Sequence, residues 1–190
     1  YICSIMSKIE ANTIDSISGT STLTLGSSNA STIALGSGDV QSNFLYPAFH
    51  AYLSSAQSLS EETNTKINFD TEEFDSNGCY DNSSNYRFTP TLAGKYYVYS
   101  QIYWVQNTTT NIKNTAIRIY KNGSQLRRNF QLFTGSYIQY FTSQITSIVD
   151  MNGSSDYLEI FGSYDTNNNG GCQAYNGADV TYFGAYRIGT

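Results

Sequence analysis

Two parts of the chain differ in how apolar and polar residues are arranged. Residues 13–43 are almost free of charged and aromatic side chains, and a Ser-Thr-x-x-Leu-Gly-Ser unit at residues 21–27 recurs at residues 31–37. Within each unit apolar residues alternate with polar or small ones, a pattern typical of a short strand with one apolar face. Two such strands cannot cover their own apolar face, so we expect three chains to wind together as a β-stalk. The stalk-packing residues are Leu23, Leu25, Ile33 and Leu35. A disordered Ser/Gly linker is the alternative.

From Leu45 onward, aromatic residues become dense and strand-like runs are separated by Asn, Asp and Gly turns. Many strands at short spacing, with no helical period between them, indicate an all-β sandwich or jelly roll. We therefore expect a stalk or anchor over residues 1–44 and a jelly-roll head over residues 45–190. The strands expected in the head are Ala48–Leu53, Thr65–Phe69, Tyr86–Thr89, Gly94–Trp104, Thr115–Lys121, Gln125–Leu132, Tyr137–Val149, Asp156–Ser163 and Val180–Ile188.

The run from Gly94 to Trp104 is aromatic on both of its faces. Alternation places Tyr96, Val98, Ser100 and Ile102 on one face, and the opposite face carries Tyr97, Tyr99, Gln101 and Tyr103. A strand with two such faces needs cover on both. We expect one face to meet the core of the sandwich and the other a neighbouring subunit.

Composition and charge narrow the classes of partner. The 190 residues include 17 Tyr and 10 Phe, and 10 basic against 15 acidic residues give a net charge of −5. No basic face is available for phosphate backbones or anionic lipids, so nucleic acid and membrane are excluded as partners. No apolar run approaches the ~20 residues that cross a bilayer. The opening five residues are too short for a signal peptide, and Met6-Ser7-Lys8 resembles a translation start.

Few residues suggest catalytic or metal chemistry. His50 is the single histidine, and its place inside a strand favours a packed ring over a general base. The acidic residues between Glu61 and Asp75 could hide a glycosidase pair, but a solvated loop is the simpler interpretation. Asp150, Asp156 and Asp165 lie in Asn/Gly-rich loops that are weak candidates for Ca²⁺, because neither loop follows the EF-hand order. We expect no cofactor.

The three cysteines carry no zinc-ligand spacing. Cys79 and Cys172 both fall in Gly/Asn-rich stretches and could form a disulfide if the fold brings them together. Free thiols in loops are the simpler interpretation.

Several motifs occur in the order in which they occur in the complement C1q-like head, the jelly-roll relative of tumour necrosis factor (TNF). Residues 47–51 resemble its Pro-Ala-Phe-x-Ala strand, and residues 67–70 resemble the next strand. Residues 86–98 are similar to its Phe-x-x-Pro-x-x-Gly-x-Tyr-Tyr-Phe core, and residues 120–123 to its Lys-Asn-Gly hairpin. Residues 182–186 resemble its closing Phe-x-Gly strand.

This resemblance implies a compact homotrimer about a threefold axis. The residues that it assigns to core or trimer packing are Phe49, Phe88, Tyr96, Tyr97, Val98, Tyr99, Tyr103, Phe183 and Tyr186. The chain departs from collagen-stalked members because it has no Gly-X-Y repeat. Its Ser/Thr/Leu/Gly repeat looks instead like the head-and-stalk proteins of marine and cyanobacterial phage virions.

We therefore expect a non-enzymatic virion protein, made in the host cytoplasm and displayed on the particle surface. It would be a trimeric short fibre or capsid decoration, attached through its N-terminal segment to capsid or tail proteins. The head would reinforce the shell, adhere to a host surface glycan or protein, or both. A cellular lectin-like module is the alternative, and a tail-associated polysaccharide hydrolase is disfavoured by the single histidine.

Overall fold

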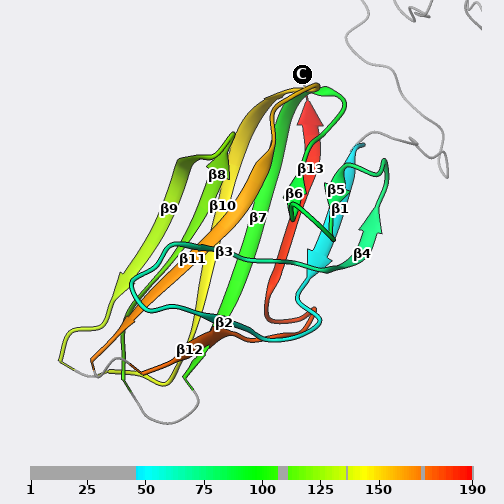
Figure 1. Cartoon of the computed structure of the whole chain (residues 1–190). Helices are drawn as coiled ribbons and strands as arrows, with labels where there is room; N and C mark the ends of the chain where they lie inside the picture. Colours follow the sequence, from blue (N-terminus) through cyan, green and yellow to red (C-terminus); the bar gives the residue numbers. More distant parts are fainter. Residues whose placement is uncertain (1–45, 107–110, 136, 168–169, 190) are drawn as a thin grey trace, which may run out of the picture. The chain divides into compact units, whose positions relative to one another are not determined.

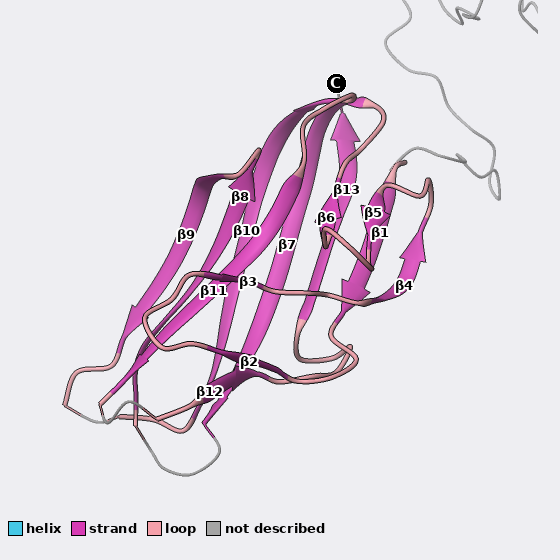
Figure 2. Cartoon of the chain, viewed as in Figure 1, coloured by secondary structure: helices cyan, strands magenta, loops and turns pink. Residues whose placement is uncertain are grey.

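The computed structural model describes residues 46–106, 111–135, 137–167 and 170–189, so the expected stalk with Leu23, Leu25, Ile33 and Leu35 lies outside the described residues. All regular elements in the described part are strands (Figures 1 and 2). They are β1 (Ala48–Tyr52), β2 (Gln57–Leu59), β3 (Thr65–Lys66), β4 (Thr71–Asp75), β5 (Tyr80–Asp81), β6 (Arg87–Phe88), β7 (Ala93–Gln106), β8 (Ile112–Lys121), β9 (Ser124–Leu132), β10 (Tyr140–Asn152), β11 (Leu158–Thr166), β12 (Cys172–Ala174) and β13 (Tyr182–Gly189).

The strands form two antiparallel sheets that pack face to face. One sheet has seven strands in the order β2-β12-β7-β13-β1-β4, with β10 added beside β7. The other has six strands in the order β5-β6-β11-β8-β9, with β3 added beside β11. This is the expected all-β sandwich, and no helix occurs in the described residues (Figure 2). It follows that none of them forms a helix long and apolar enough to cross a membrane.

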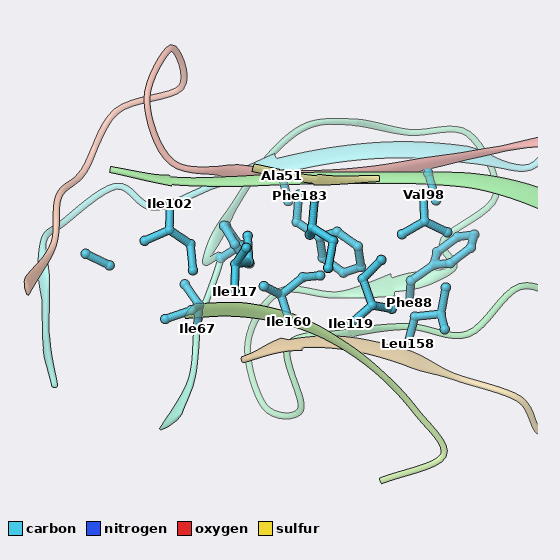
Figure 3. Close-up of a cluster of buried hydrophobic side chains, with 14 of the residues drawn as sticks. Ala51, Ile67, Phe88, Val98, Ile102, Ile117, Ile119, Leu158, Ile160 and Phe183 are labelled. Carbon is cyan, nitrogen blue, oxygen red and sulfur yellow. The ribbon is translucent and has the colours of Figure 1, made fainter. Parts of the chain in front are cut away.

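Alternating side chains of the long strands fill the space between the two sheets. Figure 3 shows Val98 and Ile102 of β7 facing Ile117 and Ile119 of β8 across this core. One part of the core is a cluster of aromatic rings. The Phe49 ring stacks on those of Tyr80 and Phe88, each with a centroid distance of 4.6 Å, and meets the Phe183 ring edge-on at 4.8 Å. Aromatic pairs of this kind stabilise a core beyond their buried area. The core side of the β7 alternation is therefore confirmed.

The hairpin between β8 and β9 follows the expected Asn-Gly turn. Asn122 and Gly123 both have positive φ, 52° and 75°, as a two-residue turn of this type requires. The Asn122 side chain also fixes the turn to the start of β11, since its Oδ1 accepts the Tyr157 N–H at 2.9 Å and its Nδ2 donates to Asp156 at 2.7 Å.

The strand predictions fail where strands are short. The expected strand Thr65–Phe69 ends at Lys66, after which Ile67 and Phe69 enter the core from irregular backbone. The acidic stretch, expected to be a loop, contains β4, whose carboxylates project from an edge strand. Strands β2, β5 and β12 were not predicted, because two or three residues are too few to show a period of two.

Of the two alternatives for Cys79 and Cys172, the structure shows free thiols and no disulfide. Both cysteines are buried free thiols, Cys79 beside β5 of the six-stranded sheet and Cys172 in β12 of the other. Burial raises the pKa of the Cys172 thiol to about 12, so this cysteine behaves as a small apolar core residue. The placement of Cys172 in a loop was wrong, because the residue lies in β12 and pairs with Leu59 and Gln106 in the sheet.

Candidate association surface

The outward face of the seven-stranded sheet carries a cluster of aromatic and apolar side chains. Strand pairing brings them together: Tyr97 of β7 lies between Tyr186 of β13 and Ile148 of β10, and His50 of β1 lies opposite Phe74 of β4. We call this surface the aromatic face, and its members are His50, Phe74, Tyr97, Tyr99, Ile148, Tyr182 and Tyr186. Ile148 is 57% exposed and Phe74 is 50% exposed, so the surface is open in the single chain.

Gly184 organises the centre of the aromatic face. It is the β13 residue paired with both Tyr99 and His50, and a Cβ atom built on it would lie 2.3 Å from the Tyr99 ring. The missing side chain lets the Tyr99 ring cross over β13, where its hydroxyl reaches His50 Nδ1 at 2.9 Å. Tyr182 and Tyr186 stand on either side, with ring centroids 6.2 and 6.5 Å from that of Tyr99. The Tyr-x-Gly-x-Tyr sequence of β13 thus forms a recess in which the Tyr99 ring packs.

The electrostatics keep the centre of the aromatic face uncharged. Burial lowers the pKa of His50, and Glu73, whose Oε2 lies 3.8 Å from His50 Nε2, opposes this only in part. Burial, with neighbouring tyrosines and Glu73, raises the pKa of Tyr99 to about 12. We assign the neutral imidazole proton to Nε2, because this nitrogen faces the Glu73 carboxylate; in this tautomer Nδ1 accepts the hydrogen bond from the Tyr99 hydroxyl. A neutral aromatic surface loses little on transfer from water into an interface.

A hollow of about 360 Å³ opens beside Tyr99. It is lined by Tyr97, Tyr99, Ser100, Gln144, Thr146 and Tyr182, which come from β7, β10 and β13. Its lining combines tyrosine rings with hydroxyl and amide groups. A hollow of this size can receive one or two apolar side chains from another molecule.

A second apolar surface lies along one side of the sandwich. Strands β9 and β10 each pair with a single neighbour and so form the edges of their sheets. The two edges meet where Asn129 Nδ2 of β9 donates to the Gln144 carbonyl of β10 at 2.7 Å. Phe130 and Leu132 on β9 are 43% and 48% exposed, and Tyr140 on β10 is 51% exposed. We call these two strands the β9–β10 edge. Its exposed apolar side chains make it a second candidate for contact.

Charge differs between the β9–β10 side of the sandwich and the β4 edge of the seven-stranded sheet. Arg127 and Arg128 are exposed on β9 beside β10, whereas Glu72 and Glu73 lie on β4, the opposite edge of that sheet. The β9–β10 edge is therefore basic and the β4 edge acidic. This arrangement favours contact between one edge and the far side of another copy, and disfavours contact between two like edges.

The candidate calcium ligands are used in other interactions. Asp150 pairs with Lys95 at 2.9 Å, Asp156 with Lys121 at 2.8 Å and Asp165 with Lys113 at 2.7 Å. Hydrogen bonds from Asn122 and Lys121 lower the pKa of Asp156, which ties the β8–β9 turn to the loop before β11. Among the described residues no three His, Cys, Asp or Glu side chains gather into a group that could hold a metal ion.

The predicted packing residues fall into two sets. Phe49, Phe88, Tyr96, Val98 and Phe183 are fully buried in the core, whereas Tyr97, Tyr99, Tyr103 and Tyr186 are half-buried on the outward side of the seven-stranded sheet. His50 is packed among aromatic rings, as expected. Sequence reasoning missed Phe74, Ile148, Phe130 and Leu132, which are all exposed.

No family model and no curated protein matches the sequence. Solved structures share the fold at 12% identity. The Eiger TNF of S. frugiperda has a TM-score of 0.52 and covers 76% of this chain and 93% of that chain. The globular domain of zebrafish complement 1qA has a TM-score of 0.51 with 75% and 97% covered, and murine APRIL a TM-score of 0.51 with 74% and 98% covered. This likeness shows the fold alone: the head is a TNF/C1q-like jelly roll.

Proposed function

We propose that the chain is a non-enzymatic structural and binding protein whose head assembles into a homotrimer on the surface of a virion. The observation that carries the proposal is the open aromatic face on a sheet whose opposite side is already filled by the core. A contiguous apolar surface of this kind marks a site of protein association. The C1q/TNF resemblance implies threefold symmetry for it.

Two different surfaces on one chain support a ring over a twofold pair. In a closed cyclic trimer, one patch of each chain contacts a different patch of the next. The β9–β10 edge supplies exposed Phe130 and Leu132, and the hollow beside Tyr99 can receive such side chains. Contact of the basic β9–β10 edge with the acidic β4 side of the next copy adds charge complementarity.

The virion role rests on the sequence of the N-terminal segment. Its charge-poor repeat is suited to a three-chain β-stalk, and a stalk of this kind suits a short fibre or a capsid decoration. We propose that this segment attaches to capsid or tail proteins while the head faces outward, reinforcing the shell or adhering to the host surface.

Assembly through the aromatic face is tested by replacing Tyr97 and Tyr99 with Ser. Both side chains lie on the outward side of the sheet, so the double variant should fold and sediment as a monomer. Tyr157→Ser is the matched control, because Tyr157 is also half-buried but packs against Arg87 near the other sheet. A trimer that survives the double substitution would contradict the placement of the interface.

The virion role is tested on purified particles. We expect the protein there in a copy number divisible by three. A chain lacking residues 1–44 should remain a trimer but no longer attach to particles. A full-length control has Leu23, Leu25, Ile33 and Leu35 changed to Ser. It keeps the length of the segment but removes the side chains that pack the stalk, so it should also fail to attach if attachment depends on the stalk. Particles without the protein would refute this part of the proposal.

A further inference from the structure

A second hollow lies away from the aromatic face and the β9–β10 edge. It is a groove of about 230 Å³ between the β1–β2 loop, the β3–β4 connection and the residue before β6. Its floor and walls include Leu53, Ser55, Gln57, Asn68, Asp70 and Tyr86. None of these residues belongs to the aromatic face or to the β9–β10 edge.

Hydrogen bonds join the chain segments on either side of the groove. Gln57 donates from Nε2 to the Lys66 carbonyl at 2.8 Å and accepts the Asn68 N–H on Oε1 at 2.9 Å. Asp70 accepts both the Ser54 N–H at 2.8 Å and the Ser54 hydroxyl at 2.7 Å. These bonds fix the walls before any ligand arrives, and a preformed site loses less entropy on binding.

Tyr86 enters the groove from strained backbone. Its φ of 48° lies in the left-handed region that aromatic residues seldom adopt. The preceding turn holds it there, because the Asp81 carboxylate accepts the N–H groups of Ser83, Ser84 and Asn85. Lys66 adds a bond of 2.9 Å to the Asn85 carbonyl. Backbone strain maintained by its surroundings is concentrated at functional sites.

The groove leaves polar groups free for a ligand. Within the described residues, the Asn68 side-chain amide and the Tyr86 hydroxyl make no hydrogen bond to the chain. Desolvation raises the pKa of Asp70, but the Ser54 hydrogen bonds outweigh it and the pKa lies below its ordinary value. The carboxylate is therefore ionised at neutral pH and retains acceptor capacity. No lysine or arginine lines the groove, so an anionic ligand would meet only repulsion.

We infer that this groove binds one neutral sugar unit of a saccharide. Asp70 would accept hydrogen bonds from sugar hydroxyls, Asn68 would both donate and accept, and the Tyr86 ring would pack against the apolar face of the sugar. The volume is below the ~300–1,000 Å³ of sites for drug-sized ligands, which suits a single ring. The inference gives a ligand class to the adhesive role proposed above and rests on that role.

The test uses the full chain on a printed array of neutral and acidic oligosaccharides, followed by titration with the strongest neutral hit. Asp70→Asn and Asn68→Ala should each lower the affinity at least tenfold. Glu62→Gln removes one carboxylate, and Asn167→Ala one exposed amide, outside the groove lining; both controls should bind like the unmodified chain. Asn68→Ala removes a side chain that makes no hydrogen bond in the described fold, so it carries the test if Asp70→Asn unfolds.

Three results would overturn the inference: no neutral saccharide bound, equal affinity in the groove variants, or binding of acidic saccharides alone. Sedimentation of the same sample keeps the two proposals apart. A trimer that binds no sugar refutes the groove and leaves the assembly standing. A monomer whose sugar binding depends on Asp70 and Asn68 refutes the assembly and supports the groove.

Discussion

Gly184→Ala tests the construction of the aromatic face at its centre. The new methyl group would stand 2.3 Å from the Tyr99 ring, a distance that no rotation of the methyl relieves. The tyrosine must therefore swing away, which breaks its hydrogen bond to His50 and separates it from Tyr182 and Tyr186.

We expect Gly184→Ala to lower the free energy of unfolding through overpacking, which costs about 1–3 kcal/mol in a well-filled site. Roughly 0.5–1.5 kcal/mol of this cost comes from the lost hydrogen bond between Tyr99 and His50. Against this, replacing glycine by alanine within a strand gains about 0.5–1 kcal/mol of backbone entropy. When Gly184→Ala is made in a chain that already carries Tyr99→Ala, the clash disappears and only the gain in backbone entropy remains. The double-mutant cycle should therefore give a coupling free energy of about 2 kcal/mol between the two sites.

The assay is urea unfolding of the four proteins, followed by fluorescence and repeated over a range of protein concentrations, because assembly shifts apparent stability. Gly184→Ala alone should lower the free energy of unfolding. Together with Tyr99→Ala it should be neutral or stabilising relative to Tyr99→Ala. An equal penalty in both backgrounds would refute the account of how Tyr99 is seated.

Three further outcomes follow from the same structure. Trp104 is fully buried, and its Nε1 donates to the Ser143 hydroxyl at 2.9 Å. Trp104→Ala should therefore lower the free energy of unfolding in urea by about 3–5 kcal/mol. A loss below about 1 kcal/mol would contradict the place of Trp104 in the core. Burial lowers the pKa of His50, so the unfolded chain takes up the proton more readily, and the free energy of unfolding should fall as the pH drops through the ordinary value of 6.5. His50→Gln should flatten that part of the pH profile, and parallel profiles would show that His50 does not contribute. Phe130 and Leu132 are exposed on an edge strand, so changing both to Ser should weaken the trimer. The thermal midpoint of the monomer should stay within a few degrees of that of the unmodified chain. An unchanged sedimentation profile would show that the β9–β10 edge is not part of the interface.

Long strands could be predicted from the sequence because they repeat a pattern many times. Strand β7 spans 14 residues, and Tyr96, Val98, Ser100 and Ile102 form the core face that the alternation predicted. Strand β3 could not be bounded in this way. Ile67 and Phe69 alternate like strand residues, and the Ile67 N–H still donates to the Ile160 carbonyl of β11. The next N–H, that of Asn68, donates to the Gln57 side chain instead of to a strand.

The association surface could be predicted only in part. Tyr97 and Tyr99 follow from alternation within one strand, whereas Phe74, His50 and Ile148 join them through pairing of strands distant in sequence. The role of Gly184 depends on a ring reaching it from the neighbouring strand, which no local pattern records. The choice between a Cys79–Cys172 disulfide and free thiols stayed open for the same reason, because spacing along the chain does not show which sheet each residue enters.

The central claim, that the aromatic face is covered by another copy of the chain, is tested most directly by sedimentation equilibrium of the full protein at micromolar concentration. We expect a single species with three times the 21.1 kDa mass of one chain. A species of 21.1 kDa that persists as concentration rises would contradict it.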